Sequence, residues 1–112
     1  MPVDLARLKR SRQSIVEAGG FRFTIERPTQ YEIVAAGGVL RADLDFIARH
    51  VVAWDLKEGD LVPGGDPVPA AFDADVLALW LADQPALWAP LARGMRDAFQ
   101  AWEEAQDAKG KA

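Results

Sequence analysis

The stretch Ser14-Ile-Val-Glu-Ala-Gly-Gly-Phe-Arg-Phe-Thr-Ile-Glu-Arg27, near the N-terminus, decides the fold of this chain. Its central pair, Gly19-Gly20, can supply the positive φ angles that a tight hairpin turn requires. After this turn, Phe21, Phe23 and Ile25 alternate with polar residues, which is the period of a strand with one solvent-exposed face. The sequence therefore predicts a β-hairpin over residues 14–27.

Helix signals surround the hairpin. A two-stranded hairpin is only marginally stable in water by itself, so its apolar face must pack on other elements. Residues 4–11 are compatible with a short charged helix before the hairpin. After it, Thr29 and Glu32 have the spacing of a capping box, which predicts a helix over residues 29–36 that ends at Gly37-Gly38.

Three longer helices are predicted further along the chain. Asp43 begins one over residues 43–54, because apolar residues recur there at helical steps of three and four. Asp73 caps one over residues 73–83, and Pro85 starts the last, over residues 86–104. Between the first two lies a glycine- and proline-rich loop, with a short extended piece expected at Leu61-Val62. The apolar face of the first helix comprises Leu44, Ile47, Val51 and Trp54.

These elements predict an α+β fold that is mainly α, with the N-terminal β-hairpin packed on a small bundle of three to four helices. The chain of 112 residues has the length of one domain, which we place over residues 1–104. Residues 105–112 are polar and are expected to fray.

Composition favours a protein that binds over one that catalyses. The chain has four tryptophans, no cysteine and a single histidine. Tryptophan anchors cores and interfaces, whereas disulfides and thiolate metal sites need cysteine. His50 lies on a predicted helix without a neighbouring nucleophile, so a structural role is favoured. We therefore predict no catalytic, cofactor-binding or metal site, and no enzyme activity.

Charge and hydropathy bear on the location and on the partners. The net charge is −4, with nine basic and seven acidic residues in residues 1–57 but four and ten in residues 58–112. The basic cluster near the N-terminus is interpreted as a solvated helix face, so nucleic acid is disfavoured as a partner. The most apolar stretch, Val76–Ala92, is broken by Pro85 and Pro90 and falls short of the ~20 residues of a membrane span. No apolar secretion signal begins the chain, and a cytoplasmic location is expected.

The last helix carries the strongest functional lead. Its apolar residues recur at steps of four and three, from Leu87 to Trp102, with Gly94 predicting close packing or a bend. Core packing is the first interpretation of such a stripe. Because few other elements could cover it, an apolar groove for a partner helix or a self-association seam is the alternative. The candidate partner-binding residues are Trp80, Trp88, Leu91, Met95, Phe99 and Trp102.

Several segments resemble the tail assembly chaperones of long-tailed bacteriophages and prophages. They are Phe23-Thr-Ile-Glu-Arg-Pro-Thr29 followed by Glu32, then Val51-Val-Ala-Trp54, and then Pro67-Val-Pro-Ala-Ala-Phe-Asp73. The resemblance spans most of residues 10–102 and involves no chemical signature. It implies a small, mainly helical protein that keeps the long, hydrophobic tape measure protein soluble during tail morphogenesis. It also implies self-association as an option, and no catalytic residues.

Two other functions stay open. One is a small nucleic-acid-associated regulator that uses its basic N-terminal segment, whose binding would weaken steeply with salt. The other is a structural component of the phage tail, which would remain in the finished particle. The residues invoked for the regulator are Arg7, Lys9, Arg10, Arg12 and Arg22.

Overall fold

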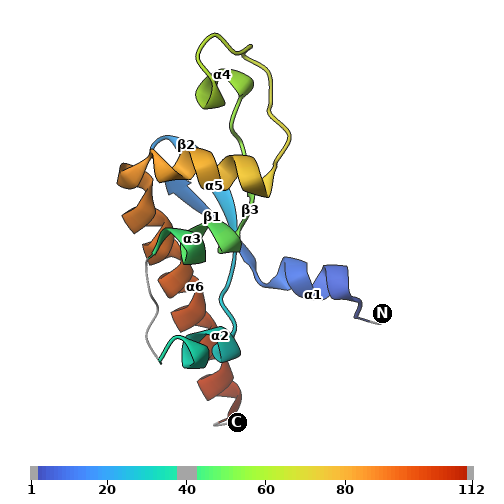
Figure 1. Ribbon diagram of the computed structural model, residues 1–112. Coiled ribbons are helices and arrows are strands. Elements are labelled where there is room, and N and C mark those ends of the chain that lie inside the picture. Colours follow the sequence, from blue (N-terminus) through green and yellow to red (C-terminus); the bar gives the residue numbers. More distant parts are fainter. Residues whose placement is uncertain (1–2, 38–42, 111–112) are drawn as a thin grey trace.

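A three-stranded antiparallel sheet and helices arranged along it make up the chain, which is described by a computed structural model over residues 3–37 and 43–110 (Figure 1). The predicted α+β fold, mainly α with an N-terminal hairpin, is confirmed. The elements are α1 (Leu5–Ser11), β1 (Gln13–Ala18), β2 (Phe21–Glu26), α2 (Gln30–Ala35), α3 (Leu44–His50), β3 (Val51–Trp54), α4 (Glu58–Leu61), α5 (Ala74–Ala82) and α6 (Pro85–Gly110).

The hairpin forms where its turn chemistry predicts. Gly19 and Gly20 have φ angles of 60° and 82°, so both central residues of the two-residue turn occupy the left-handed region. Ala18 pairs with Phe21 directly across the turn, and the ladder continues to Gln13 opposite Glu26. This register turns the alternate apolar residues of β2 toward the helices, as the pattern of the sequence predicts.

A third strand replaces the end of a predicted helix. The helix expected over residues 43–54 ends at His50, and Val51–Trp54 pairs with β2 in the strand order β1-β2-β3. The prediction was wrong here because Val51 and Trp54 fit the apolar face of a helix and also fit a strand. Val51 is buried, and its β-branched side chain suits a pleated strand. As part of β3, it pairs with the edge of β2 that β1 leaves free.

The predicted helix starts are confirmed by their caps. Thr29 Oγ1 accepts from the backbone of Glu32 while the Glu32 carboxylate accepts from Thr29, which completes the capping box of α2. Asp43 accepts from the backbone of Phe46, and Asp73 caps α5 in the same way. Gly37 follows α2 with a positive φ, whereas the predicted stop at Gly38 lies outside the described residues.

The loop between β3 and α5 contains more structure than expected. Residues Glu58–Leu61 form α4, so the extended piece predicted at Leu61-Val62 is helical at its first residue. A single antiparallel bridge joins Lys57 to Pro69 and closes the loop at its base. In Figure 1 the loop and α4 project beyond the end of the sheet.

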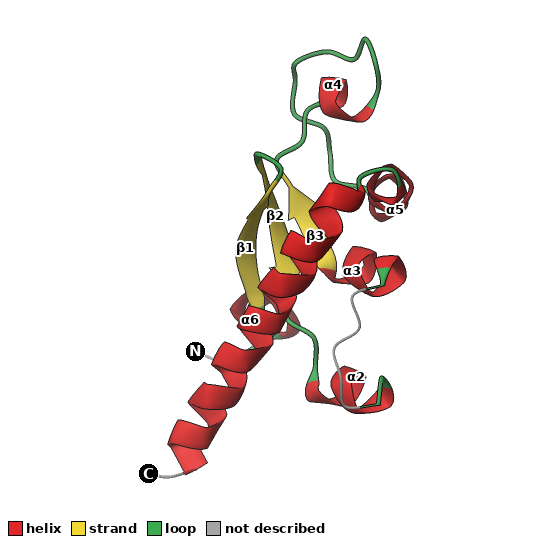
Figure 2. Cartoon of the chain, turned by 90° about the vertical axis from the view of Figure 1, so that its left-hand side faces the viewer, coloured by secondary structure: helices red, strands yellow, loops and turns green. Residues whose placement is uncertain are grey.

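The last helix begins at Pro85 as predicted but is longer than predicted. It continues to Gly110, through most of the segment for which a frayed tail was expected, and residues 111–112 lie outside the described part. Figure 2 shows α6 crossing the sheet diagonally, with its C-terminal half extending past the strands. The strands therefore do not cover the C-terminal half of α6.

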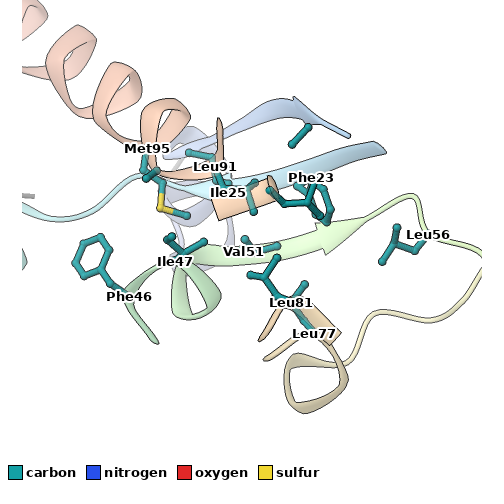
Figure 3. Close-up of a cluster of buried hydrophobic side chains, with 13 residues drawn as sticks. Phe23, Ile25, Phe46, Ile47, Val51, Leu56, Leu77, Leu81, Leu91 and Met95 are labelled. Atoms are coloured by element: carbon teal, nitrogen blue, oxygen red, sulfur yellow. The ribbon is translucent and has the colours of Figure 1, made fainter. Parts of the chain in front are cut away.

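The core lies between the sheet and the helices α3, α5 and α6. Phe23 and Ile25 of β2 are fully buried, and Figure 3 shows Ile25 beside Leu91 of α6. The hairpin thus gains from the helices the apolar cover that it needs to be stable. By contrast, the apolar side chains of α1 are exposed, and none of its residues belongs to the core.

Candidate partner-binding surface

Three of the six predicted partner-binding residues belong to the core. Leu91 and Met95 of α6 are fully buried, and Phe99 is 8% exposed. These three side chains are covered within the chain itself, because α6 lays this face across the sheet and α3. Figure 3 shows Leu91 and Met95 above Ile25 and Ile47. The favoured interpretation of the apolar stripe, core packing, holds for them.

Trp80 and Trp88 are half-buried and pack against the core from α5 and α6. The Nε1 of Trp80 donates to the backbone oxygen of Asp60 at 3.2 Å, so this side chain links α5 to α4. The Nε1 of Trp88 donates to the Leu81 oxygen at 2.7 Å and links the start of α6 to α5. Both indoles therefore satisfy their polar end within the chain and keep part of the ring accessible.

Trp102 is also half-buried, but it lies in a different environment. The guanidinium of Arg27 lies 4.3 Å from the centre of its ring, a cation–π arrangement. The centre of the Trp102 ring also lies 5.6 Å from the centre of the Phe99 ring. Trp102 lines a groove between β1 and α6, and it is the only one of the six predicted residues that does so.

The outer face of α5 is the apolar surface that sequence reasoning missed. Leu77 and Leu81 are fully buried, yet Val76 is 42% exposed and Leu79 is 78% exposed. Asp75 is the only charged residue of this helix. A helix that is apolar around its whole circumference is normally covered on every side. The near-absence of polar residues in Ala74–Ala82 was the signal that could have revealed this face.

His50 has a structural role, as its isolation in the sequence predicts. It is 5% exposed, and its Nδ1 lies 2.8 Å from the Phe46 oxygen. Its Nε2 lies 2.8 Å from Oε2 of Glu32, which joins α3 to α2. Burial raises the pKa of Glu32, but the hydrogen bonds from Thr29 and the nearby imidazole outweigh it and hold this pKa below its usual value. Because both ring nitrogens are engaged, the imidazole acts as a link between helices.

The basic residues of the N-terminal segment do not form one surface with Arg22. Arg7, Lys9 and Arg10 are exposed on α1. The Nε of Arg22 instead lies 3.3 Å from Oε1 of Glu17, on the neighbouring strand of the sheet. The basic residues invoked for a nucleic-acid-associated regulator are therefore divided between the N-terminal segment and the sheet.

Within residues 3–37 and 43–110, no group of three or more histidine, aspartate or glutamate side chains is arranged to hold a metal ion. In that same part of the chain, none of the helices combines the length and the apolar character that crossing a membrane requires. Comparisons with known protein families, curated proteins and solved structures gave no match.

Proposed function

We propose that this chain is an assembly chaperone of the phage tail type, which binds a helical, hydrophobic tape measure protein during tail morphogenesis. The observation that carries the proposal is the exposed apolar face of α5, defined by Val76 and Leu79. The motif resemblance in the hairpin, β3 and the loop before α5 supports it independently. No catalysis is part of this proposal.

The chemistry of the α5 face suits a helical partner. Val76 and Leu79 are three residues apart, so they lie on adjacent turns of the same side of α5. An amphipathic helix could pack its own apolar ridge along them, in the manner of helix–helix contacts. The half-buried ring of Trp80 lies on the same helix. The ring of Trp88 belongs to α6 and is hydrogen-bonded to Leu81 near the C-terminal end of α5, so both rings would enlarge the contact. Burying these side chains against a partner would contribute a favourable free energy of about 25 cal/mol for each Å² of apolar area removed from water.

Co-expression with a tape measure protein tests the proposal. We expect the wild-type chain to keep that protein in the soluble fraction and to co-purify with it. Leu79→Glu should abolish both effects, because a charge on this face opposes burial and the exposed site leaves the fold intact. Leu5→Glu is the matched control, because Leu5 is a leucine 66% exposed on α1, and it should behave as the wild type does.

Two results would contradict the proposal. The first is a failure of the co-expression test: the tape measure protein stays insoluble with the wild-type chain, or the Leu79→Glu variant keeps it soluble equally well. The other is stoichiometric presence of the chain in purified tails, which would indicate a structural component instead. Size-exclusion chromatography with light scattering, run alongside, would determine whether the chaperone acts as a monomer or as a homo-oligomer.

A further inference from the structure

The strand β1 forms an open edge of the sheet. It pairs with β2 on one side, and the strand order β1-β2-β3 places no other strand of the described chain on its other side. In a hairpin closed by a two-residue turn, the pair that flanks the turn is hydrogen-bonded, and every second pair after it is too. Ala18, Val16 and Ser14 therefore direct their backbone groups toward β2.

The alternate residues of β1 direct their backbone groups outward. The bond from the Arg27 N–H to the Arg12 oxygen, at 2.7 Å, continues the alternation beyond the strand and confirms it. The N–H and C=O groups of Gln13, Ile15 and Glu17 thus point away from β2. None of them has a backbone partner among the hydrogen bonds of residues 3–37 and 43–110. Such a row of groups is a template for one more strand.

This edge borders a groove with a volume of about 1070 Å³. The residues of β1 line one side of the groove, and residues of α6 between Pro90 and Lys109 line the other. The groove is rich in positive charge, although the whole chain carries −4. Its cations are Arg12, Arg27, Arg93 and Lys109, and its anions are Glu17 and Asp97. Glu17 is already paired with Arg22, which lies outside the groove lining.

Two of these arginines lie close together and lack a counter-ion. Neither Arg12 nor Arg27 forms an ion pair within the described residues, and the buried Nε of Arg12 has no hydrogen-bond partner there. Arg27 is held over Trp102, and its Nη1 donates to the Pro28 oxygen at 3.0 Å. Burial and the neighbouring Arg12 lower the pKa of Arg27. An arriving carboxylate would relieve this repulsion and supply the missing acceptor.

We propose that this groove binds an extended acidic segment of a partner protein, which adds to β1 as a fourth strand and places a carboxylate against Arg12 and Arg27. The backbone groups of Gln13, Ile15 and Glu17 supply the strand contacts, as in other cases of β-strand addition. A second copy of this chain is disfavoured, because pairing β1 with β1 would bring two sets of the same arginines together. The site is separate from the α5 face.

A labelled peptide of about eight residues that alternates valine and glutamate is the probe, with a valine–glutamine peptide as its control. At low salt the glutamate peptide should bind, and the glutamine peptide should bind at least about tenfold more weakly. Arg12→Gln and Arg27→Gln should each weaken binding by about tenfold. Arg96→Gln removes an exposed α6 arginine outside the groove and should leave the affinity for the peptide unchanged. Leu79→Glu should also leave this affinity unchanged.

A second readout tests the strand contact without altering the protein. Hydrogen exchange at the amides of Gln13, Ile15 and Glu17 should slow when the peptide binds, while Ser14 and Val16 change little. The same peptide N-methylated at alternate residues should lose binding. The proposal is overturned if the glutamate peptide fails to bind, or if the arginine variants bind it unchanged. It is also overturned if those three amides exchange slowly in a peptide-free dimer, or if single-stranded DNA binds through the same arginines in preference to the peptide.

Discussion

Gly94 of α6 lies directly against Val16 of β1. A Cβ atom at position 94 would be 2.4 Å from Cγ2 of Val16, which is closer than real Cβ atoms approach, and 3.0 Å from its Cγ1, which is an unusually tight contact. The missing side chain therefore allows α6 to cross the sheet in close contact. Glycine in the apolar stripe of α6 predicted close packing or a bend, and close packing is confirmed. Glycine is needed here because a side chain would prevent the close approach of α6 and β1, and not because the backbone turns.

Gly94→Ala should destabilise the fold by up to about 2 kcal/mol, measured by urea denaturation. Overpacking against a stiff β-branched side chain costs about 1–3 kcal/mol, and only ~1 kcal/mol returns as helix propensity. In a Val16→Ala background, Gly94→Ala should instead raise the free energy of unfolding, because the crowding methyl groups are gone. A double-mutant cycle would measure this difference as a coupling energy between positions 16 and 94. A stabilising effect of Gly94→Ala alone would show that α6 does not approach β1 this closely.

Phe23→Ala should lower the free energy of unfolding by about 3–5 kcal/mol. Phe23 is fully buried at the centre of the sheet, and its ring contacts those of Phe21 and Trp80. Tyr31→Ala is the control, because Tyr31 is 81% exposed on α2 and should change stability by about 0.5 kcal/mol or less. Equal effects of the two substitutions would mean that the inner face of the hairpin is assigned wrongly.

The hairpin turn should tolerate asparagine at position 20 far better than valine. Gly20 has a φ of 82° and no atom near the position of a Cβ, so backbone conformation alone limits the substitution. Asparagine enters the left-handed region readily, whereas valine pays about 1–2 kcal/mol or more. Thermal denaturation of Gly20→Asn and Gly20→Val should therefore separate by several degrees. No separation would contradict the assigned turn.

The contacts of Glu32 with His50 and Thr29 should make the free energy of unfolding fall as the solution becomes acidic. The folded-state pKa of Glu32 lies below its ordinary value of 4.5, so the carboxylate stabilises the fold above that pH. This contribution disappears as the pH falls through the lowered folded-state pKa. Between about pH 5 and pH 3, the wild type should lose more stability than Glu32→Gln does.

Glu103→Gln is the control for that measurement. It removes one exposed carboxylate from α6 and should lose as much stability on acidification as the wild type does. Parallel pH curves for the wild type and Glu32→Gln would show that the contact of Glu32 with His50 and Thr29 contributes nothing to folding.

Local signals predicted the hairpin and the helix starts well. The Gly19-Gly20 turn, the capping box at Thr29 and the caps at Asp43 and Asp73 all depend on residues within a few positions of each other. Their physics is contained in short segments, so a sequence alone reveals it. The third strand was missed because pairing of Val51–Trp54 with β2 joins segments that are distant in sequence.

The candidate surfaces could be predicted only in part. The apolar stripe of α6 is visible in the sequence, but its periodicity is the same whether a sheet or a partner covers it. The structure buries Leu91 and Met95 and leaves Leu79 of α5 exposed instead. The groove beside β1 combines residues from the start and the end of the chain, such as Arg12 and Trp102, which no local pattern connects.

The amino acids alone determined where the backbone turns, where helices begin and which side chains need cover, because these depend on φ preferences, capping groups and spacing. Tertiary structure decided which elements pack on each apolar face, and therefore which indole rings stay accessible. It also placed the unpaired arginines beside the open edge of β1. Those outcomes depend on contacts between segments far apart in the chain, whose free energy is realised only when α6 and the sheet come together.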